Sequence, residues 1–189
     1  MHEGEEREGG VAMTTEPFVV PVGRLRRSHT QTQHEVRRGE VALAGPMREA
    51  GIDPGRSVVP AGAEAEVDVM LTPFEGGIEA VGTVTAPWEG TCRRCAEPVS
   101  GVLEIKVHER FGDPAGGTTA DDDFYPIVDD HIDLGPMVRD ALVLDLPMAP
   151  LCRPDCAGLC PQCGANRNEG DCGCVAPRDP RWANLDVLR

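Results

Sequence analysis

Residues 151–175 read LCRPDCAGLCPQCGANRNEGDCGCV and hold six of the eight cysteines of the chain. The cysteines come in closely spaced pairs, and one further pair lies far upstream. A tight turn between two such cysteines points both sulfurs at one tetrahedral ion, about 2.3 Å away. The spacing therefore predicts two four-cysteine metal sites, built from Cys92, Cys95, Cys152, Cys156, Cys160, Cys163, Cys172 and Cys174.

The segment from Cys160 to Cys174 can close one site by itself. Cys160-Pro-Gln-Cys163-Gly has the form of a zinc knuckle, in which proline restricts the turn and glycine lets backbone amides approach the sulfurs. The other site follows by elimination, with Cys92 and Cys95 joining Cys152 and Cys156. A partition in which Cys156 joins the tail site is also compatible with the spacing.

The amino-terminal sequence favours metal over disulfides. The first ten residues, MHEGEEREGG, are acidic and do not resemble a secretion signal, and no window approaches 18 apolar residues. We therefore expect a cytoplasmic protein without membrane contact, in which thiols stay reduced and bind two Zn²⁺ per chain. Iron in a rubredoxin-like site, and a redox role for Cys92-Arg-Arg-Cys95, are the competing interpretations.

Charge limits the choice of partners. The 189 residues carry a formal charge of −14 at pH 7, and two occupied sites would bring the total to about −18. A nucleic-acid-binding protein is usually basic, so any RNA contact should be local. Candidate RNA-binding residues are Arg93 and Arg94, which could equally balance the charge of a metal site, and the basic segment containing Arg24, Arg26, Arg27, Arg37 and Arg38.

Three regions are expected: a disordered terminus at 1–15, a β-rich domain at 16–150 and a zinc-binding tail at 151–189. In the domain, an edge strand is expected at 16–22, a loop with little regular structure at 29–62, and an acidic loop at 112–130.

Alternation of apolar and polar residues predicts a hairpin of 67–72 with 77–86, and a third strand at 103–108. Cys92 and Cys95 then lie between two antiparallel strands, and His108 is exposed and not a ligand. A helix should begin at Asp133 as N-cap with Pro136 in its first turn, and another should cover the last eleven residues. The fold class is α+β, mainly an antiparallel sheet with one packed helix and a zinc-bound carboxy-terminal extension.

Catalytic patterns are missing from the sequence. The three serines do not stand in a nucleophile elbow, and there is no glycine-rich phosphate loop. A closed four-cysteine site also leaves no open position for a substrate. We therefore expect a protein that is not an enzyme.

Several motifs together resemble the YceD family. They are Cys92-Arg-Arg-Cys95, the run from Ile132-Asp133-Leu134 to Pro147, the tail Cys152-x3-Cys156-Ala-Gly-Leu-Cys160-Pro-x-Cys163-Gly-x-Asn166-x-Asn168 with Cys172-x-Cys174, and Asp179-Pro180-Arg181 with Leu185. The resemblance covers roughly residues 60–189. Arg167 stands where a leucine is commoner, which leaves the ligands untouched.

The YceD family is known as large-ribosomal-RNA-subunit accumulation proteins, described as metal-binding, with nucleic-acid binding suggested. The resemblance implies a bacterial, non-enzymatic factor that supports accumulation of 23S rRNA during large-subunit assembly, with that rRNA or a pre-ribosomal particle as partner. The alternatives are an acidic, chaperone-like adaptor for a basic ribosomal protein and, third, a thiol redox protein or a nuclease.

Overall fold

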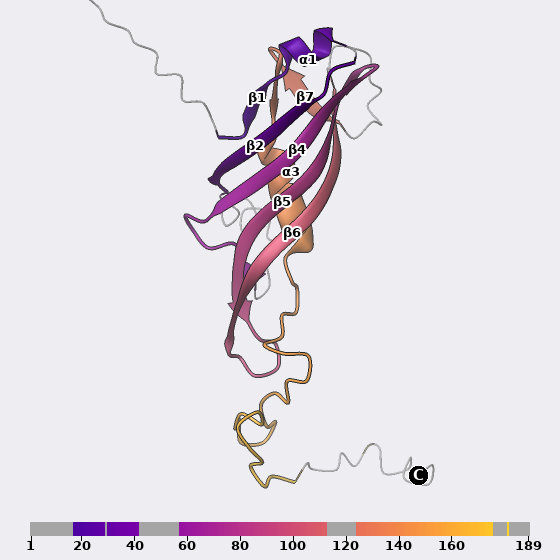
Figure 1. The fold of residues 1–189 in the computed structure, drawn as a ribbon. Coiled ribbons are helices and arrows are strands. Elements are labelled where there is room, and N and C mark those ends of the chain that lie inside the picture. Colours follow the sequence, from indigo (N-terminus) through magenta and orange to yellow (C-terminus); the bar gives the residue numbers. More distant parts are fainter. Residues whose placement is uncertain (1–16, 29, 42–56, 113–123, 176–180, 182–189) are drawn as a thin grey trace, which may run out of the picture.

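The fold is a long, curved β-sheet with one helix against it (Figure 1). The structure is a computed structural model and describes residues 17–28, 30–41, 57–112, 124–175 and 181. Its strands are β1 (Val19–Pro21), β2 (Gln33–Glu40), β3 (Ser57–Val58), β4 (Glu64–Phe74), β5 (Gly77–Thr91), β6 (Pro98–Gly112), β7 (Tyr125–Val128) and β8 (His131–Asp133), and its helices are α1 (Gly23–Arg27) and α3 (Gly135–Asp145).

Neighbouring strands follow the order β1-β8-β7-β6-β5-β4-β2, and β3 pairs with β5. All pairings are antiparallel except that of β6 with β7. This arrangement confirms the predicted α+β class, with a mainly antiparallel sheet and a packed helix. The predicted hairpin of β4 and β5 and the predicted strand within β6 are also confirmed, and β1 lies at a sheet edge as expected.

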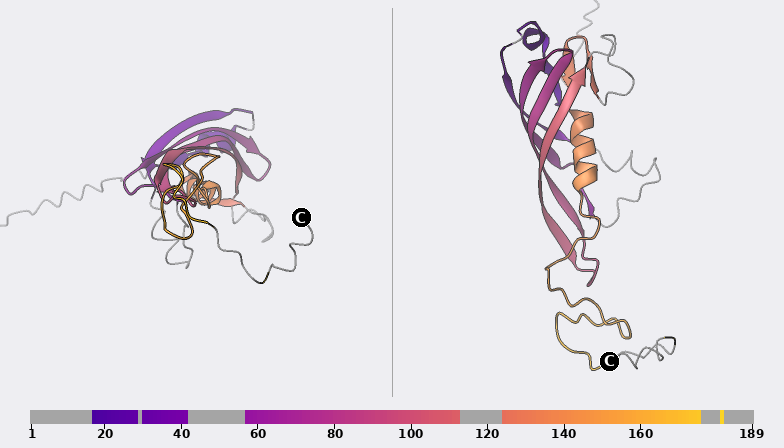
Figure 2. Two further views of the ribbon diagram at one scale, coloured as in Figure 1. Left: turned by 90° about the horizontal axis from the view of Figure 1, so that it is seen from below. Right: turned by 90° about the vertical axis from the view of Figure 1, so that its right-hand side faces the viewer.

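The sheet curves around α3, as the view from below in Figure 2 shows. Its two edges approach each other at Gly39 of β2, where a Cβ would lie 2.6 Å from the Pro17 side chain. The absence of a side chain at Gly39 therefore permits this close approach. On the other edge, the Leu134 amide donates a hydrogen bond to the Phe18 carbonyl over 3.1 Å, which extends the pairing of β1 with β8.

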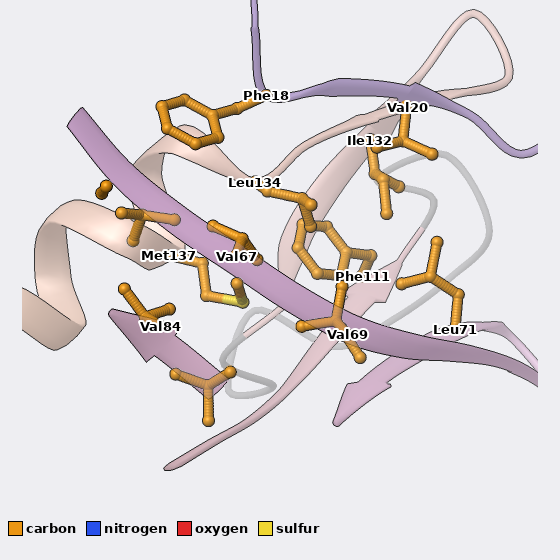
Figure 3. Close-up of a cluster of buried hydrophobic side chains, with 14 of the residues drawn as sticks. Phe18, Val20, Val67, Val69, Leu71, Val84, Phe111, Ile132, Leu134 and Met137 are labelled. Carbon is orange, nitrogen blue, oxygen red and sulfur yellow. The ribbon is translucent and has the colours of Figure 1, made fainter. Parts of the chain in front are cut away.

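The core lies between the concave face of the sheet and α3 (Figure 3). Alternate residues of β4 point inward, and Val67, Val69 and Leu71 are fully buried. They meet Phe111 of β6 and Met137 of α3, which are also buried. Apolar burial of this kind is the dominant favourable term in folding.

The prediction of a loop with little regular structure at 29–62 is wrong where β2 and β3 lie. Strand β2 lacks the expected apolar alternation because its half-buried side chains are polar and satisfy one another. Glu35 accepts a hydrogen bond from Gln33 over 2.6 Å and pairs with Arg37 over 2.7 Å. Backbone pairing with β4 along all eight residues of β2 sets this strand.

Two other boundaries differ from the sequence prediction. The expected loop at 112–130 contains β7, which pairs with β6 through Tyr125 and Pro126. The N-cap of α3 is Leu134, so the prediction of Asp133 is wrong by one residue; the Asp133 carboxylate instead accepts a hydrogen bond from the Gly135 amide over 2.8 Å. Pro136 lies in the first turn as predicted.

The expected disordered segment 1–15 and most of the expected terminal helix lie outside the described residues. In the described part of the chain, no helix is both long and apolar enough to cross a membrane.

We expect Leu71→Ala to lower the free energy of unfolding by about 2 to 5 kcal/mol, because it empties a fully buried site. Met70→Ala, one residue away on the outer face and 41% exposed, is the matched control and should cost less than about 1 kcal/mol. Urea denaturation measures both. Equal losses would contradict the assignment of the two faces of β4.

Candidate metal centres

The eight cysteine sulfurs gather into two groups of four. We call Cys92, Cys95, Cys152 and Cys156 the proximal group, and Cys160, Cys163, Cys172 and Cys174 the distal group. In each group the four sulfurs lie within 4.8 Å of one another. This is the partition that elimination predicts; the alternative, with Cys156 in the tail site, does not match the geometry.

The proximal group forms at one end of the β5–β6 hairpin. Fifteen pairs of residues run along this hairpin, from Gly77 opposite Gly112 to Thr91 opposite Pro98. Cys92 and Cys95 therefore lie in the turn between two antiparallel strands, as predicted. The Cys92 amide donates to the Glu97 carbonyl over 2.8 Å, which closes the turn.

The segment after α3 carries the other two proximal cysteines to this turn. The buried Ser57 hydroxyl donates to the Pro147 carbonyl over 2.6 Å, and the Arg93 amide donates to the Pro150 carbonyl over 2.9 Å. These two bonds hold the chain against the sheet just before Cys152. Sequence reasoning missed this role of Ser57, for which a single buried serine gives no recognisable signal.

Arg94 also holds the tail against the turn, through both its side chain and its backbone carbonyl. Its guanidinium donates to the carbonyl of Cys156 over 3.0 Å, and its own carbonyl accepts from the Leu159 amide over 3.0 Å. Gly158 allows this approach, because it has a φ of +73° and a Cβ there would lie 3.0 Å from the Arg94 carbonyl. The Arg94 side chain, a candidate RNA contact, is therefore held by the protein itself.

The distal group closes within residues 160–174. The Cys160 amide donates to the Ala165 carbonyl over 2.8 Å, and the Gly164 amide donates to the Cys160 carbonyl over 2.9 Å. Gly164 has a φ of +75°, a conformation that glycine adopts without strain. The knuckle predicted from Cys160-Pro-Gln-Cys163-Gly is thus formed.

The donor set fits a tetrahedral metal ion. Cys92 and Cys156 have their sulfurs 3.8 Å apart, and Cys95 and Cys152 have theirs 3.6 Å apart. Four sulfurs at about 2.3 Å from one ion would lie about 3.8 Å from one another, whereas a disulfide needs about 2.05 Å. These distances suit a shared ion and exclude disulfides between these pairs.

Hydrogen bonds prepare two of the thiols for ligation. Burial raises the pKa of Cys92, but the backbone amides of Cys95, Cys152 and Arg94 outweigh it and bring the pKa down to about 6. In the distal group, the backbone amides of Cys163 and Gln162 lower the pKa of Cys160 to about 6. A metal binds the thiolate, so the lowered pKa favours ligation by these two thiols. Desolvation and the neighbouring thiols instead raise the pKa of Cys152 to about 12, and that thiol ionises only when an ion offsets the charge.

The two groups differ in exposure. Cys92, Cys95 and Cys156 are buried and pack against Val99 and Leu151, whereas only Cys160 of the distal group is buried. The proximal group is therefore part of the folded body, and the distal group lies near solvent.

The five arginines of the predicted basic segment do not form one surface. Arg24, Arg26 and Arg27 lie on α1, at the opposite end of the molecule from the tail (Figure 1). Arg26 and Arg27 both pair with Asp130, over 2.9 and 3.6 Å.

The other two basic residues belong to opposite faces of β2. Arg37 pairs with Glu35 on the half-buried side, and Arg38 pairs with Glu66 of β4 on the exposed side. The candidates Arg93 and Arg94 lie at the proximal group. His108 is exposed and bound to Glu79 over 2.7 Å, away from both sulfur groups, as predicted.

Comparison with known proteins places the chain in a family. Residues 80–189 match the family model described as "Large ribosomal RNA subunit accumulation protein YceD". The chain belongs to the YceD family. The matched residues include both sulfur groups, all of β6 and α3, and most of β5, so the resemblance seen in the cysteine motifs is confirmed.

Relatives occur in mycobacteria and in a plant. An uncharacterized protein of Mycobacterium tuberculosis is 40% identical over 127 residues, which cover 66% of this chain and 61% of the relative. One from Mycobacterium leprae is 35% identical, covering 69% and 62%. A Zea mays protein named large ribosomal RNA subunit accumulation protein YCED homolog 1, chloroplastic, is 28% identical, covering 76% and 57%.

The aligned part thus spans about three fifths of the length of the mycobacterial relatives. No solved structure matches the chain significantly.

Proposed function

We propose that this protein is a non-enzymatic cytoplasmic factor that supports accumulation of 23S rRNA and assembly of the large ribosomal subunit. Membership of the YceD family, whose description names large-subunit rRNA accumulation, is the observation that carries the proposal. The same words stand in the name of the plant relative. The partner on this proposal is large-subunit rRNA or a pre-ribosomal particle.

Each sulfur group would hold one Zn²⁺, with the eight cysteines as the ligands. Zinc would supply folding free energy, since binding to a structural site is coupled to ordering of the chain around it. Four protein sulfurs fill a tetrahedral site, so neither ion would have a position open to water or substrate. This supports a structural role and argues against a redox protein or a nuclease.

Purified under reducing conditions, the protein should contain two Zn²⁺ per chain and be colourless, because zinc has a filled d shell. Elemental analysis together with the visible spectrum measures this. Cys160→Ser with Cys163→Ser should leave one Zn²⁺ and a folded sheet, since the proximal group draws all its ligands from elsewhere. Iron with visible absorption, or four disulfides by intact mass, would contradict the proposal.

Depletion of the protein in its own bacterium should lower the ratio of 23S to 16S rRNA and reduce free and assembled large subunits. Quantitative RNA analysis and sucrose-gradient profiles measure the two effects. Expression of the wild-type chain should restore both, which controls for indirect effects of depletion. Unchanged rRNA ratios and subunit profiles would overturn the ribosomal function.

A specific observation favours a second candidate, an adaptor for a basic ribosomal protein. Four of the five arginines in the basic segment pair with carboxylates, and the formal charge is −14. Within the basic segment, Arg24 and Arg27 on α1 remain the candidates for direct RNA contact, because both side chains are exposed and the pair of Arg27 with Asp130 is long, at 3.6 Å. A basic protein would instead be attracted by the excess of acidic groups.

Filter binding to 23S rRNA fragments across salt concentrations separates the two. If α1 contacts phosphates, Arg24→Gln with Arg27→Gln should weaken binding and flatten the salt slope by about 2. Lys106→Gln with Arg110→Gln, two exposed cations on β6, removes the same charge elsewhere and should change the slope little. If both double variants bind RNA like the wild type, α1 is not an RNA contact and the adaptor is favoured.

A further inference from the structure

Asn168 belongs to the loop of the distal group but binds a cysteine of the proximal group. It lies between Cys163 and Cys172 in sequence. Its side-chain nitrogen Nδ2 is 3.4 Å from the sulfur of Cys156 and donates a hydrogen bond to it. A side chain of the distal loop therefore contacts a sulfur of the proximal group.

The orientation of the Asn168 amide is fixed by its partners. Its Oδ1 accepts from the Ala157 amide and from the Arg153 guanidinium, each over 2.8 Å. Both partners can only donate, so oxygen must face them and nitrogen must face Cys156. The second hydrogen of Nδ2 goes to Oδ1 of Asn166 over 2.8 Å, which uses the full bonding capacity of the side chain.

The distal loop is folded back onto the three residues that join the two groups. Leu159 and Asn166 form an antiparallel bridge, and the Arg167 amide donates to the Gly158 carbonyl over 2.9 Å. These bonds place Asn168 beside Cys156. Distal ligands flank the loop on both sides, so closing the distal group would limit the positions that Asn168 can take.

We propose that Asn168 couples the two metal sites, so that closure of the distal group by a metal ion holds its amide on Cys156 and strengthens binding at the proximal group. This inference rests on the metal binding proposed above. Coupling between two sites is reciprocal, so occupation of the proximal group strengthens the distal group by the same factor. Residues that hydrogen-bond a metal ligand typically change affinity by about 10- to 100-fold.

The test is competition of the full-length chain with a chromophoric chelator for Zn²⁺. Cys163→Ser with Cys174→Ser gives the affinity of the proximal group alone, and Cys92→Ser with Cys95→Ser that of the distal group alone. The coupling factor is the overall two-ion association constant of the intact chain divided by the product of these two constants. We expect a factor of about ten or more.

Asn168→Ala, measured in the same three backgrounds, should bring this factor close to one. Gln162→Ala is the matched control, because it removes another side-chain amide of the distal loop and keeps the backbone amide. The side-chain nitrogen of Gln162 donates to the Val175 carbonyl over 2.6 Å, away from Cys156, so the coupling factor should not change. A factor of one in the wild type, or an unchanged factor in Asn168→Ala, overturns the coupling while two bound Zn²⁺ still support the metal sites. Failure of the wild type to bind Zn²⁺ overturns both.

A second measurement does not depend on the serine variants folding. In the chain loaded with two Co²⁺, loss of the hydrogen bond to Cys156 should shift the sulfur-to-cobalt charge-transfer absorption in Asn168→Ala and not in Gln162→Ala. Identical spectra for the two variants would overturn the role of Asn168.

Discussion

The register of β5 with β6 is the constraint on which the rest of the structure depends. Each of the fifteen residues of β5 is paired with one of β6, so this register fixes where the turn at the end of the hairpin lies relative to the sheet. That turn carries two of the proximal cysteines and the backbone groups that receive the tail. A slip of one residue would also exchange the two faces of each strand and bring polar side chains into the core. Packing and sulfur geometry therefore depend on the same pairing.

The sequence was most informative about the fold and the site where a single physical signal was sufficient. Alternating apolar residues in 67–72 mark a strand with one buried face, and close cysteine spacing marks metal ligands. Strand β2 gave no such signal, because Glu35 satisfies its polar neighbours and the strand is held by backbone bonds to β4. Spacing and elimination favoured the observed partition of the cysteines but left Cys156 compatible with either site, and the structure assigns it to the proximal group. The contacts that assemble this group depend on long-range pairing that spacing does not encode.

Single polar residues account for the remaining differences. Asn168 stands in the motif that resembled the YceD family, yet its partner Cys156 is twelve residues away and becomes visible only once the loop is folded. Arg94 could be interpreted from sequence as a charge beside a metal or as a contact to phosphate. Its bond to the Cys156 carbonyl shows a third use, attachment of the tail. Hydrogen bonds of this kind need a specific geometry, and composition does not predict it.

The two groups of sulfurs differ in the length of chain that each one closes. The distal group joins neighbours within residues 160–174, whereas the paired sulfurs of the proximal group are 57 and 64 residues apart. The entropic cost of closing a loop rises with its length, and contacts this distant form only when the intervening strands and α3 are in place. A chain whose sheet is paired incorrectly would not bring these four sulfurs together, so closure of the proximal group requires a correctly paired sheet.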